Sequence, residues 1–295
     1  MNPGSLAWKS NIKQEVDWKD FHSWMLKTCR PEHCRVVVTQ AKKYCLCLLN
    51  HDFSEITILK ETTRPNAMKS LSALSKYLGM HEDFKLLVKN YSLKWTGRSA
   101  EDLIVDRITK VQNSNEIFEW IKQVKHIRPE LCEFMDFMAI TGLRLVEAVA
   151  SYNLIIKLSR EDRLNEYYVY EKGVLEHFRF KEVFFRKSKK AFLSFVSIDM
   201  VHKIGEKKPF SSCFYVQNLI RNKGKGLKLH FGDIREVNGT LLTKYLKDNE
   251  IDFLHGRVTS SVFMKNYFNP SLISDLKVRA FKASDEIEAK IQGNS

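Results

Sequence analysis

Apolar side chains recur at helical spacing along most of this chain, and one stretch near its middle breaks that pattern. Large apolar residues return every three or four positions across residues 17–95, again across 129–153, and once more toward the C-terminus, which is the spacing of a helix's buried face. Three segments in between are rich in β-branched and aromatic residues, as strands are: Tyr167–Tyr170, His177–Phe185 and Ala191–Ser197. Arg186–Lys190 lies between the last two and is expected to be a basic hairpin. The sequence therefore predicts a mainly α fold with a small antiparallel β-sheet.

The helical pattern falls into two parts, joined near Thr96–Ser99. Gly97 interrupts the pattern, and Ser99 is suited to cap the helix that follows. We therefore expect an N-terminal helical domain at residues 1–97 and a second domain at residues 98–295, since a chain of 295 residues can form two compact cores. The aromatic residues of the first domain are interpreted as core rather than as a platform for stacking nucleotides. The expected helices include Ala67–Leu78, Glu82–Tyr91, Ala100–Val111, Glu116–Lys125, Asp233–Lys247, Ser260–Tyr267 and Ser271–Lys290.

The net charge of +13 is the first indication of function. Residues 1–97 hold 15 Lys and Arg against 9 Asp and Glu, and the remaining residues hold 33 against 26. Both parts are therefore basic, which suits a protein that contacts a polyanion such as DNA from two sides. Charge alone is equally compatible with a basic protein that binds no nucleic acid.

Hydropathy and cysteine usage bear on where the protein works. The longest apolar runs, such as Phe192–Val196, are far shorter than a membrane span, and the N-terminus lacks the apolar segment of a signal peptide. Without a secretory signal, the six cysteines are expected to be free thiols. The Cys and His residues between 29 and 47 lack the pair spacing of structural zinc sites. We expect a soluble, cytoplasmic protein associated with DNA, with no membrane contact.

Five side chains have the chemistry that phosphoryl transfer on DNA requires: Arg144, Lys189, Arg235, Arg257 and Tyr267. Arginines can fork onto the non-bridging oxygens of a phosphate with fixed geometry. A lysine on a hairpin can give a proton to the leaving 5′-oxygen. A tyrosine can attack the phosphorus and form an aryl phosphodiester, which keeps the bond energy for religation. Taken singly, each of these would more often be a solvated or packing side chain, so the prediction depends on their order along the chain.

Their local settings resemble the conserved boxes of the tyrosine recombinases, also called tyrosine integrases. Thr141–Ala148 reads Thr-Gly-Leu-Arg-Leu-Val-Glu-Ala, which resembles the first-arginine box, with Glu three residues after Arg. Asp233–Arg235 resembles the second-arginine box. Leu254–Val258, followed by Tyr267 ten residues past Arg257, resembles the final box and nucleophile.

Within that family the chain is most similar to archaeal viral and plasmid integrases of the fuselloviral type. The Gly-Arg-Val form of residues 256–258 and the Asn-Tyr-Phe-Asn-Pro sequence of residues 266–270 carry this resemblance. Phe84–Lys89 and Leu93–Gly97 also fit the N-terminal half of that group. The resemblance extends over most of the chain from about Asp17.

The resemblance implies a role for each matching residue. Arg144 and Arg235 would bind the scissile phosphate, and Glu147 would buttress Arg144. Arg257 would occupy the place where most members have His or Trp. Tyr267 would attack the phosphate and form a 3′-phosphotyrosyl link.

Two positions leave alternatives open. Lys189 would be the general acid by its match to the archaeal pattern, although Lys187 and Lys190 compete with it on the same hairpin. Three residues before the second arginine, the family has His, or Lys in archaeal members, whereas this chain has Gly232. The function of this basic residue would then be taken by His230 or Lys228.

The fold and activity implied by the resemblance follow from these roles. A helical core-binding domain and a tyrosine-recombinase catalytic domain would clamp double-stranded DNA attachment sites as a homotetramer. The protein would be a site-specific recombinase that integrates or excises an archaeal mobile element, with no metal or other cofactor. The last helix would dock on a neighbouring protomer or on its own domain. The alternatives are a DNA-binding protein of the same fold with weakened chemistry and a type IB topoisomerase.

Overall fold

The computed structural model describes residues 16–29, 31–95, 99, 101–102, 104–105, 114–186, 189–223, 229–257, 269–270 and 273–293. Within them the chain is mostly helical with a small antiparallel sheet, which confirms the expected fold class. It divides into two compact units, residues 1–111 and 112–295. The predicted domain boundary after residue 97 falls among residues outside the described set and stays a prediction. Each unit is described by itself.

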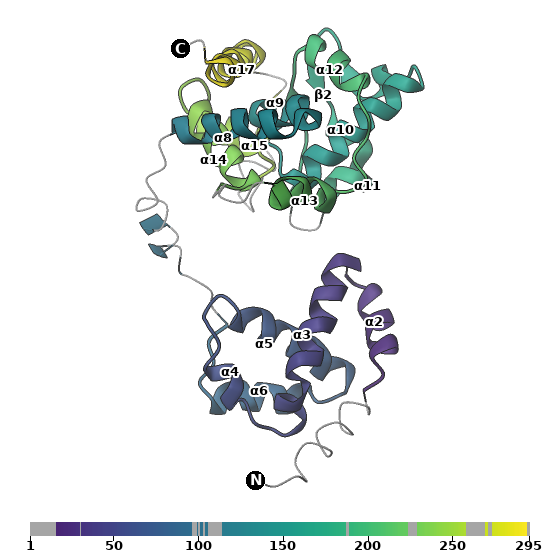
Figure 1. The fold of residues 1–295 in the computed structure, drawn as a ribbon, viewed down its shortest axis with the longest axis vertical. Coiled ribbons are helices and arrows are strands. Elements are labelled where there is room, and N and C mark those ends of the chain that lie inside the picture. The colour runs from purple at the N-terminus through teal and green to yellow at the C-terminus, as the bar shows by residue number, and fades with distance from the viewer. Residues whose placement is uncertain are drawn as a thin grey trace. The chain divides into compact units, whose positions relative to one another are not determined.

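The first unit is a helical bundle (Figure 1). Its helices are α2 (Trp18–Leu26), α3 (Pro31–Leu49), α4 (Ser54–Thr57), α5 (Arg64–Tyr77) and α6 (His81–Asn90). The Asp17 side chain caps α2 by accepting from two backbone N–H groups. Phe21 and Tyr44 are fully buried, and Trp18 and Trp24 pack against the same core. These four aromatic residues therefore belong to the core, as expected from their helical spacing.

Helices also form most of the second unit (Figure 1). They are α8 (Ser114–Ile127), α9 (Cys132–Thr141), α10 (Leu145–Arg160), α12 (Ile198–Gly205), α13 (Cys213–Lys223), α14 (Phe231–Leu242), α15 (Asp248–Leu254) and α17 (Leu276–Gln292). Every residue of α9 from Phe134 to Met138 except Asp136 is fully buried, because neighbouring helices pack around it. This arrangement makes α9 the central helix of the unit.

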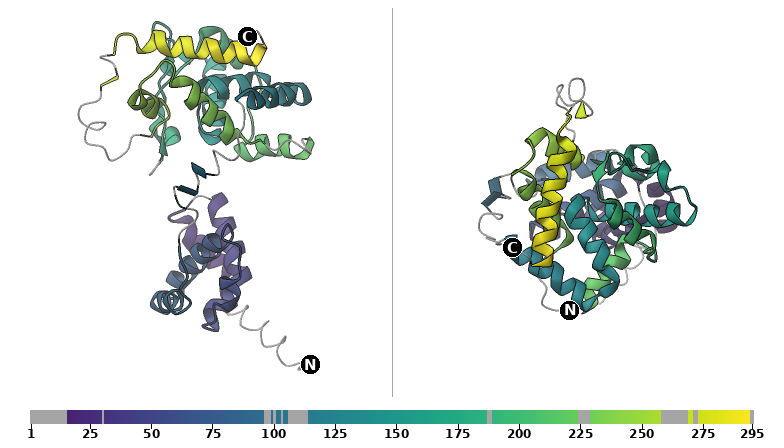
Figure 2. Two further views of the ribbon diagram at one scale, coloured as in Figure 1. Left: turned by 90° about the vertical axis from the view of Figure 1, so that its left-hand side faces the viewer. Right: turned by 90° about the horizontal axis from the view of Figure 1, so that it is seen from above.

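The last helix, α17, packs on its own unit (Figure 2). Its buried face includes Ala280, Ala283 and Ile287, and it contacts α8, α9, α14 and β5. Of the two docking modes considered from the sequence, the structure shows the one within the same chain.

The strands form two small sheets beside the helices. β1 (Tyr168–Val169), β2 (Val174–Leu175) and β5 (Ser194–Phe195) pair antiparallel in the order β1-β2-β5. β3 (Phe185–Arg186) and β4 (Lys189–Lys190) form a separate antiparallel pair. The basic hairpin is therefore present where the sequence predicted it.

The predicted strand at His177–Phe185 is wrong for most of its length. A 3₁₀ turn, η3 (His177–Phe180), and a short helix, α11 (Lys181–Phe184), occupy it instead. The His177 ring is fully buried and bonds through Nδ1 to the Tyr167 hydroxyl at 2.6 Å and through Nε2 to Ser194 Oγ at 2.9 Å. Burial of His177 and Phe184 in the core outweighs the strand propensity of the segment.

The other expected helices agree with the structure to different degrees. Those at 67–78, 82–91 and 116–125 are confirmed within a few residues. The helix expected at 233–247 ends at Leu242, and α12, α13 and α15 were not foreseen. The helix at 260–267, the first residues of the one from 271, and most of 100–111 lie outside the described residues.

No single helix in the described part of the chain is long and apolar enough to cross a membrane. Only the consecutive helices Pro129–Thr141 and Leu145–Arg160, bent by 119° at their junction, reach that length and composition together. That junction is the corner that carries Arg144.

Candidate active site

A left-handed glycine forms the corner between α9 and α10. Gly142 has φ +57°, and its N–H donates to Met138 O at 3.0 Å, which ends α9. A Cβ on this residue would lie 2.3 Å from Asn238 Oδ1 and 2.7 Å from His255 Nε2. Glycine is therefore required both for the backbone conformation and for the close approach of these two side chains.

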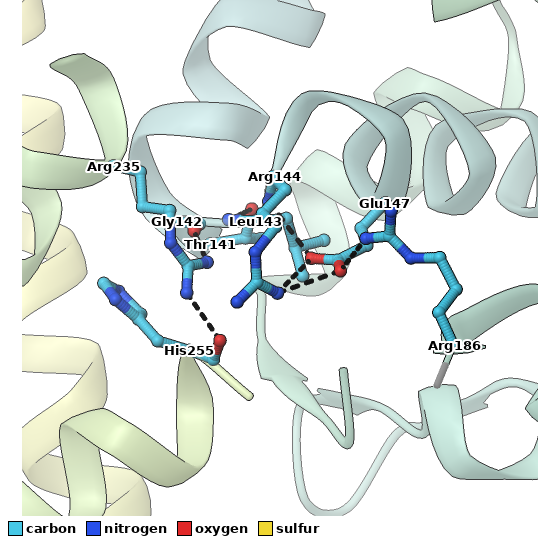
Figure 3. A network of polar contacts seen from close by, with 8 residues as sticks. All are labelled: Thr141, Gly142, Leu143, Arg144, Glu147, Arg186, Arg235 and His255. Carbon is cyan, nitrogen blue, oxygen red and sulfur yellow. Dashed lines mark hydrogen bonds and ion pairs between the residues drawn. The ribbon is translucent and has the colours of Figure 1, made fainter. Parts of the chain in front are cut away.

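Two residues later, Arg144 begins α10 and pairs with Glu147 (Figure 3). The Arg144 backbone N–H donates to Glu147 Oε2 at 3.2 Å, as in the reciprocal half of a capping box. Arg144 Nη1 donates to Glu147 Oε1 at 3.0 Å and to Oε2 at 3.2 Å. The Glu147 side chain is 2% exposed, so this buried carboxylate holds the guanidinium of Arg144 in place.

The guanidinium of Arg235 bridges the first and last boxes. Nη1 donates to Gly142 O and Nη2 donates to His255 O, each at 2.5 Å. Gly142 lies two residues before Arg144, and His255 lies two residues before Arg257. The three arginine boxes, which are far apart in sequence, therefore meet around Arg235 (Figure 3).

Arg144 and Arg235 also line one cavity of about 670 Å³. Arg221 and His230 lie in its wall, and no Asp or Glu is among the described residues that line it. Burial, together with the charges of Arg144 and Arg257, lowers the pKa of Arg235 to about 10. An anion in this cavity would relieve that repulsion and bind to N–H donors already held in place.

A buried side-chain pair, Asn238 and His255, joins the end of α9 to the segment that follows α15. Asn238 Nδ2 donates to the carbonyls of Ala139 and Ile140 at 2.8 and 3.0 Å, so its Oδ1 must be the acceptor for His255 Nε2 at 2.7 Å. His255 is 1% exposed, and burial together with the nearby arginines lowers its pKa to about 3. His255 is therefore neutral at pH 7, with its proton on Nε2, and it links α14 to the end of α15.

Arg257 lies at the exposed side of the cluster. Its side chain is 48% exposed, and Nη1 is 3.8 Å from Asp252 Oδ1. It is close enough to lower the pKa of both Arg235 and His255. The structure thus places Arg257 near the other two arginines but leaves its guanidinium open to solvent.

Gly256 places the hairpin next to this cluster. It has φ +59°, and a Cβ on it would lie 1.5 Å from the carbonyl oxygen of Lys190. The backbone of β4 therefore packs directly against the Gly256–Arg257 segment, and only glycine allows that approach.

The register of the hairpin separates two of the three candidate lysines. Arg186 pairs with Lys189, and Phe185 pairs with Lys190. Directly opposed residues of a ladder share a face. The Arg186 side chain points to Glu147, whereas Lys190 Nζ lies over the Phe185 ring at 5.8 Å. Lys189 is thus on the face that carries Arg186 and Glu147, and Lys190 is on the other.

The remaining predicted residues are placed only in part. Tyr267, Lys187 and Lys228 lie outside the described residues. Gly232 and His230 line the same cavity as Arg144 and Arg235. A Cβ added to Gly232 would meet no heavy atom within 4 Å, so the site has room for a side chain at this position.

Sequence reasoning missed three residues of this network: Arg186, Asn238 and His255. Asn238 lies three residues after Arg235, so one turn of helix places the two residues side by side. Its amide lies on an otherwise apolar helix face, and this could have indicated a buried polar residue of the site. Arg186 was recognised only as part of a basic hairpin, because its partner Glu147 lies 39 residues away. His255 lay within a quoted box, but its burial has no local signature.

The chain was compared with protein-family models, with curated proteins and with solved structures, and none of them matches it. The interpretation of the site therefore depends on its residues and their geometry.

Proposed function

We propose that this protein is a site-specific DNA recombinase of the tyrosine type. The observation that carries the proposal is the position of Arg235, which bonds to the Gly142 carbonyl of the Arg144 corner and to the His255 carbonyl beside Arg257. Arg144 and Arg235 then line one cavity where a phosphate can bind. Arg257, from a third segment, is close enough to Arg235 to lower its pKa. A developing phosphorane needs this kind of preorganised positive charge.

The proposed reaction uses the surrounding side chains in sequence. Arg144 and Arg235 bind the non-bridging oxygens of the scissile phosphate, and Arg257 adds charge from the solvent side. The Tyr267 hydroxyl gives its proton to His230, which lines this cavity, or to water, and its oxygen attacks phosphorus. The 3′-phosphotyrosyl bond forms, and the bond to the 5′-oxygen breaks. Lys189 gives its proton to that leaving oxygen. Religation is the reverse reaction, with a 5′-hydroxyl as the nucleophile.

The proposed substrate is duplex DNA that contains an attachment site of an archaeal mobile element. Recombination of two such sites requires two cleaved duplexes at once, which fits a homotetramer in which each protomer cleaves one strand. The basic excess of both parts of the chain supports contacts with phosphates on either side of the site.

A second candidate is a DNA-binding protein of the same fold with weakened chemistry. Gly232 favours it, because a residue without a side chain occupies the place next to Arg235 where the resembled family has a basic group. A type IB topoisomerase would share the cleavage step, and it would relax supercoiled plasmid without exchanging strands.

Covalent capture tests the proposal directly. The probe is a pool of duplex oligonucleotides with a randomised core and a nick that lets the cleaved fragment diffuse away. We expect the wild-type chain to form adducts that persist under denaturing conditions. Tyr267→Phe should form none, because it lacks the nucleophile, although it should still bind DNA. Sequencing the captured DNA would then define the cleaved site.

The same assay separates the candidates. DNA binding without any adduct would favour the weakened protein, and an adduct mapped to Tyr245 would refute the assignment of the nucleophile. Tyr245 is a suitable comparison because its hydroxyl donates to Glu286, which raises its pKa.

A further inference from the structure

We infer that Arg186 is a positioning residue that holds the Lys189 hairpin against the Arg144 corner through Glu147. The inference rests on the proposed function, since it assigns Arg186 a part in proton delivery during DNA cleavage. Arg186 itself does not contact the phosphate in this scheme.

One buried carboxylate joins the two halves of the site. Glu147 Oε1 accepts from Arg186 Nη2 at 2.5 Å and from Arg144 Nη1 at 3.0 Å, while Oε2 accepts from the Arg144 backbone and side chain. The Arg186 side chain is 21% exposed and Glu147 is 2% exposed, so the pair is shielded from water. A shielded, charge-assisted bond of this kind is stronger and more directional than a surface pair.

The strand register passes this restraint to the lysine. Arg186 is directly opposite Lys189 in the β3–β4 ladder, and the two side chains share a face. Fixing the Arg186 side chain on Glu147 therefore fixes the side of the hairpin from which Lys189 projects. Figure 3 shows the connection from Arg144 through Glu147 to Arg186. The strand pairing extends it from Arg186 to Lys189.

The hairpin needs such a restraint because it has little stability of its own. Its strands are two residues each, and an isolated two-stranded ladder is marginal in water. The β4 backbone has a separate contact, where the Lys190 carbonyl lies against Gly256. Arg186 anchors the β3 side, so the two contacts together set the position of Lys189.

Loss of Arg186 is not expected to unfold the protein. Arg144 would remain bonded to both oxygens of Glu147, so no buried carboxylate would be left without a cation. The expected defect is displacement of Lys189, and misplacement by about 1 Å of a reacting group can slow a reaction by about 10²-fold.

The test compares two forms of one captured DNA site, with oxygen or with sulfur at the scissile 5′-bridging position. A thiolate leaves without a proton, so the sulfur substrate does not need the general acid. On the oxygen substrate we expect Arg186→Gln and Lys189→Ala to slow single-turnover cleavage. On the sulfur substrate we expect both variants to cleave at the wild-type rate. Arg186→Lys, which can still reach Glu147 with one N–H, should recover most of the rate on oxygen.

Arg163→Gln is the matched control, because Arg163 is exposed and pairs with Glu161 and Glu166. It should cleave both substrates at the wild-type rate. If Arg186→Gln slows both substrates equally, Arg186 acts through Arg144 and the phosphate, and the inference is overturned. The inference is also overturned if Arg186→Gln cleaves the oxygen substrate at the wild-type rate.

The wild-type and Lys189→Ala arms keep this result separate from the proposed function. If the wild-type chain forms no adduct with either substrate, the proposed recombinase activity fails, and the positioning role fails with it. If wild type cleaves and the sulfur substrate rescues Lys189→Ala but not Arg186→Gln, only the inference about Arg186 fails.

Discussion

The two halves of the candidate site are held in different ways. The Arg144–Arg235 half is built from helix ends, and Arg235 bonds to two backbone carbonyls that belong to packed segments. The Lys189 half is a short hairpin, and its contacts with the rest of the site include one ion pair and one close backbone approach. Groups that stabilise charge must be preorganised before reaction, whereas a proton donor only has to reach the leaving oxygen. The comparison indicates a phosphate-binding half that is built into the packed helices and an acid half that is held by fewer contacts.

The largest expected effect in the phosphate-binding half comes from Arg235→Lys. The lysine ammonium retains the positive charge. It lacks the fixed fork of N–H donors with which the guanidinium can contact the Gly142 carbonyl, the His255 carbonyl and a phosphate at the same time. We expect single-turnover cleavage to fall by about 10²–10³-fold, with little loss of DNA affinity. Sulfur at the 5′-bridging position should not restore it. Rescue by that substrate would mean that Arg235 serves proton transfer and that the two halves are not separate.

Gly142→Ala should damage the same half through its packing. The new Cβ would overlap Asn238 Oδ1 and His255 Nε2, and the alanine would have to adopt a positive φ. Strain and overpacking should lower the free energy of unfolding by about 2–3 kcal/mol, measured by urea unfolding of the full chain. Gly232→Ala is the control, because its Cβ would meet open space in a helix and should cost nothing. Equal stability of the two variants would show that position 142 has room for a Cβ atom.

Per pH unit, a smaller effect should appear in the pH dependence of the free energy of unfolding. The pKa of His255 is lowered to about 3 in the folded protein, against about 6.5 for a free histidine. Above pH 6.5 both states are neutral, and as pH falls from 6.5 toward 3 only the unfolded state gains the proton. Stability should therefore fall by at most about 1.4 kcal/mol per pH unit from this group.

His255→Gln separates that contribution from the rest. Its amide can still donate to Asn238 but does not titrate, so the slope of stability against pH below 6.5 should become shallower. His177, buried in the sheet region with a pKa also lowered to about 3, should continue to contribute its own slope. His51→Gln, at an exposed position, is the control. An unchanged slope in His255→Gln would show that His255 is not buried as a neutral side chain.

Sequence alone determined the features that depend on short-range contacts. The helical periodicity placed α5, α6 and α8 within a few residues, and the basic hairpin was found between its flanking segments. The pairing of Arg144 with Glu147, which the resemblance implied, also depends on short range, because residues three apart at a helix start are neighbours.

Only the tertiary structure decided the rest. The contact of Arg235 with the Gly142 carbonyl spans 93 residues, and that of Arg186 with Glu147 spans 39. The strand expected at His177–Phe185 became helical turns because the His177 ring is buried between Tyr167 and Ser194. Local spacing sets which residues are neighbours within an element, but the partner of a buried polar group is chosen by how the elements pack, and desolvation then makes that choice costly to change.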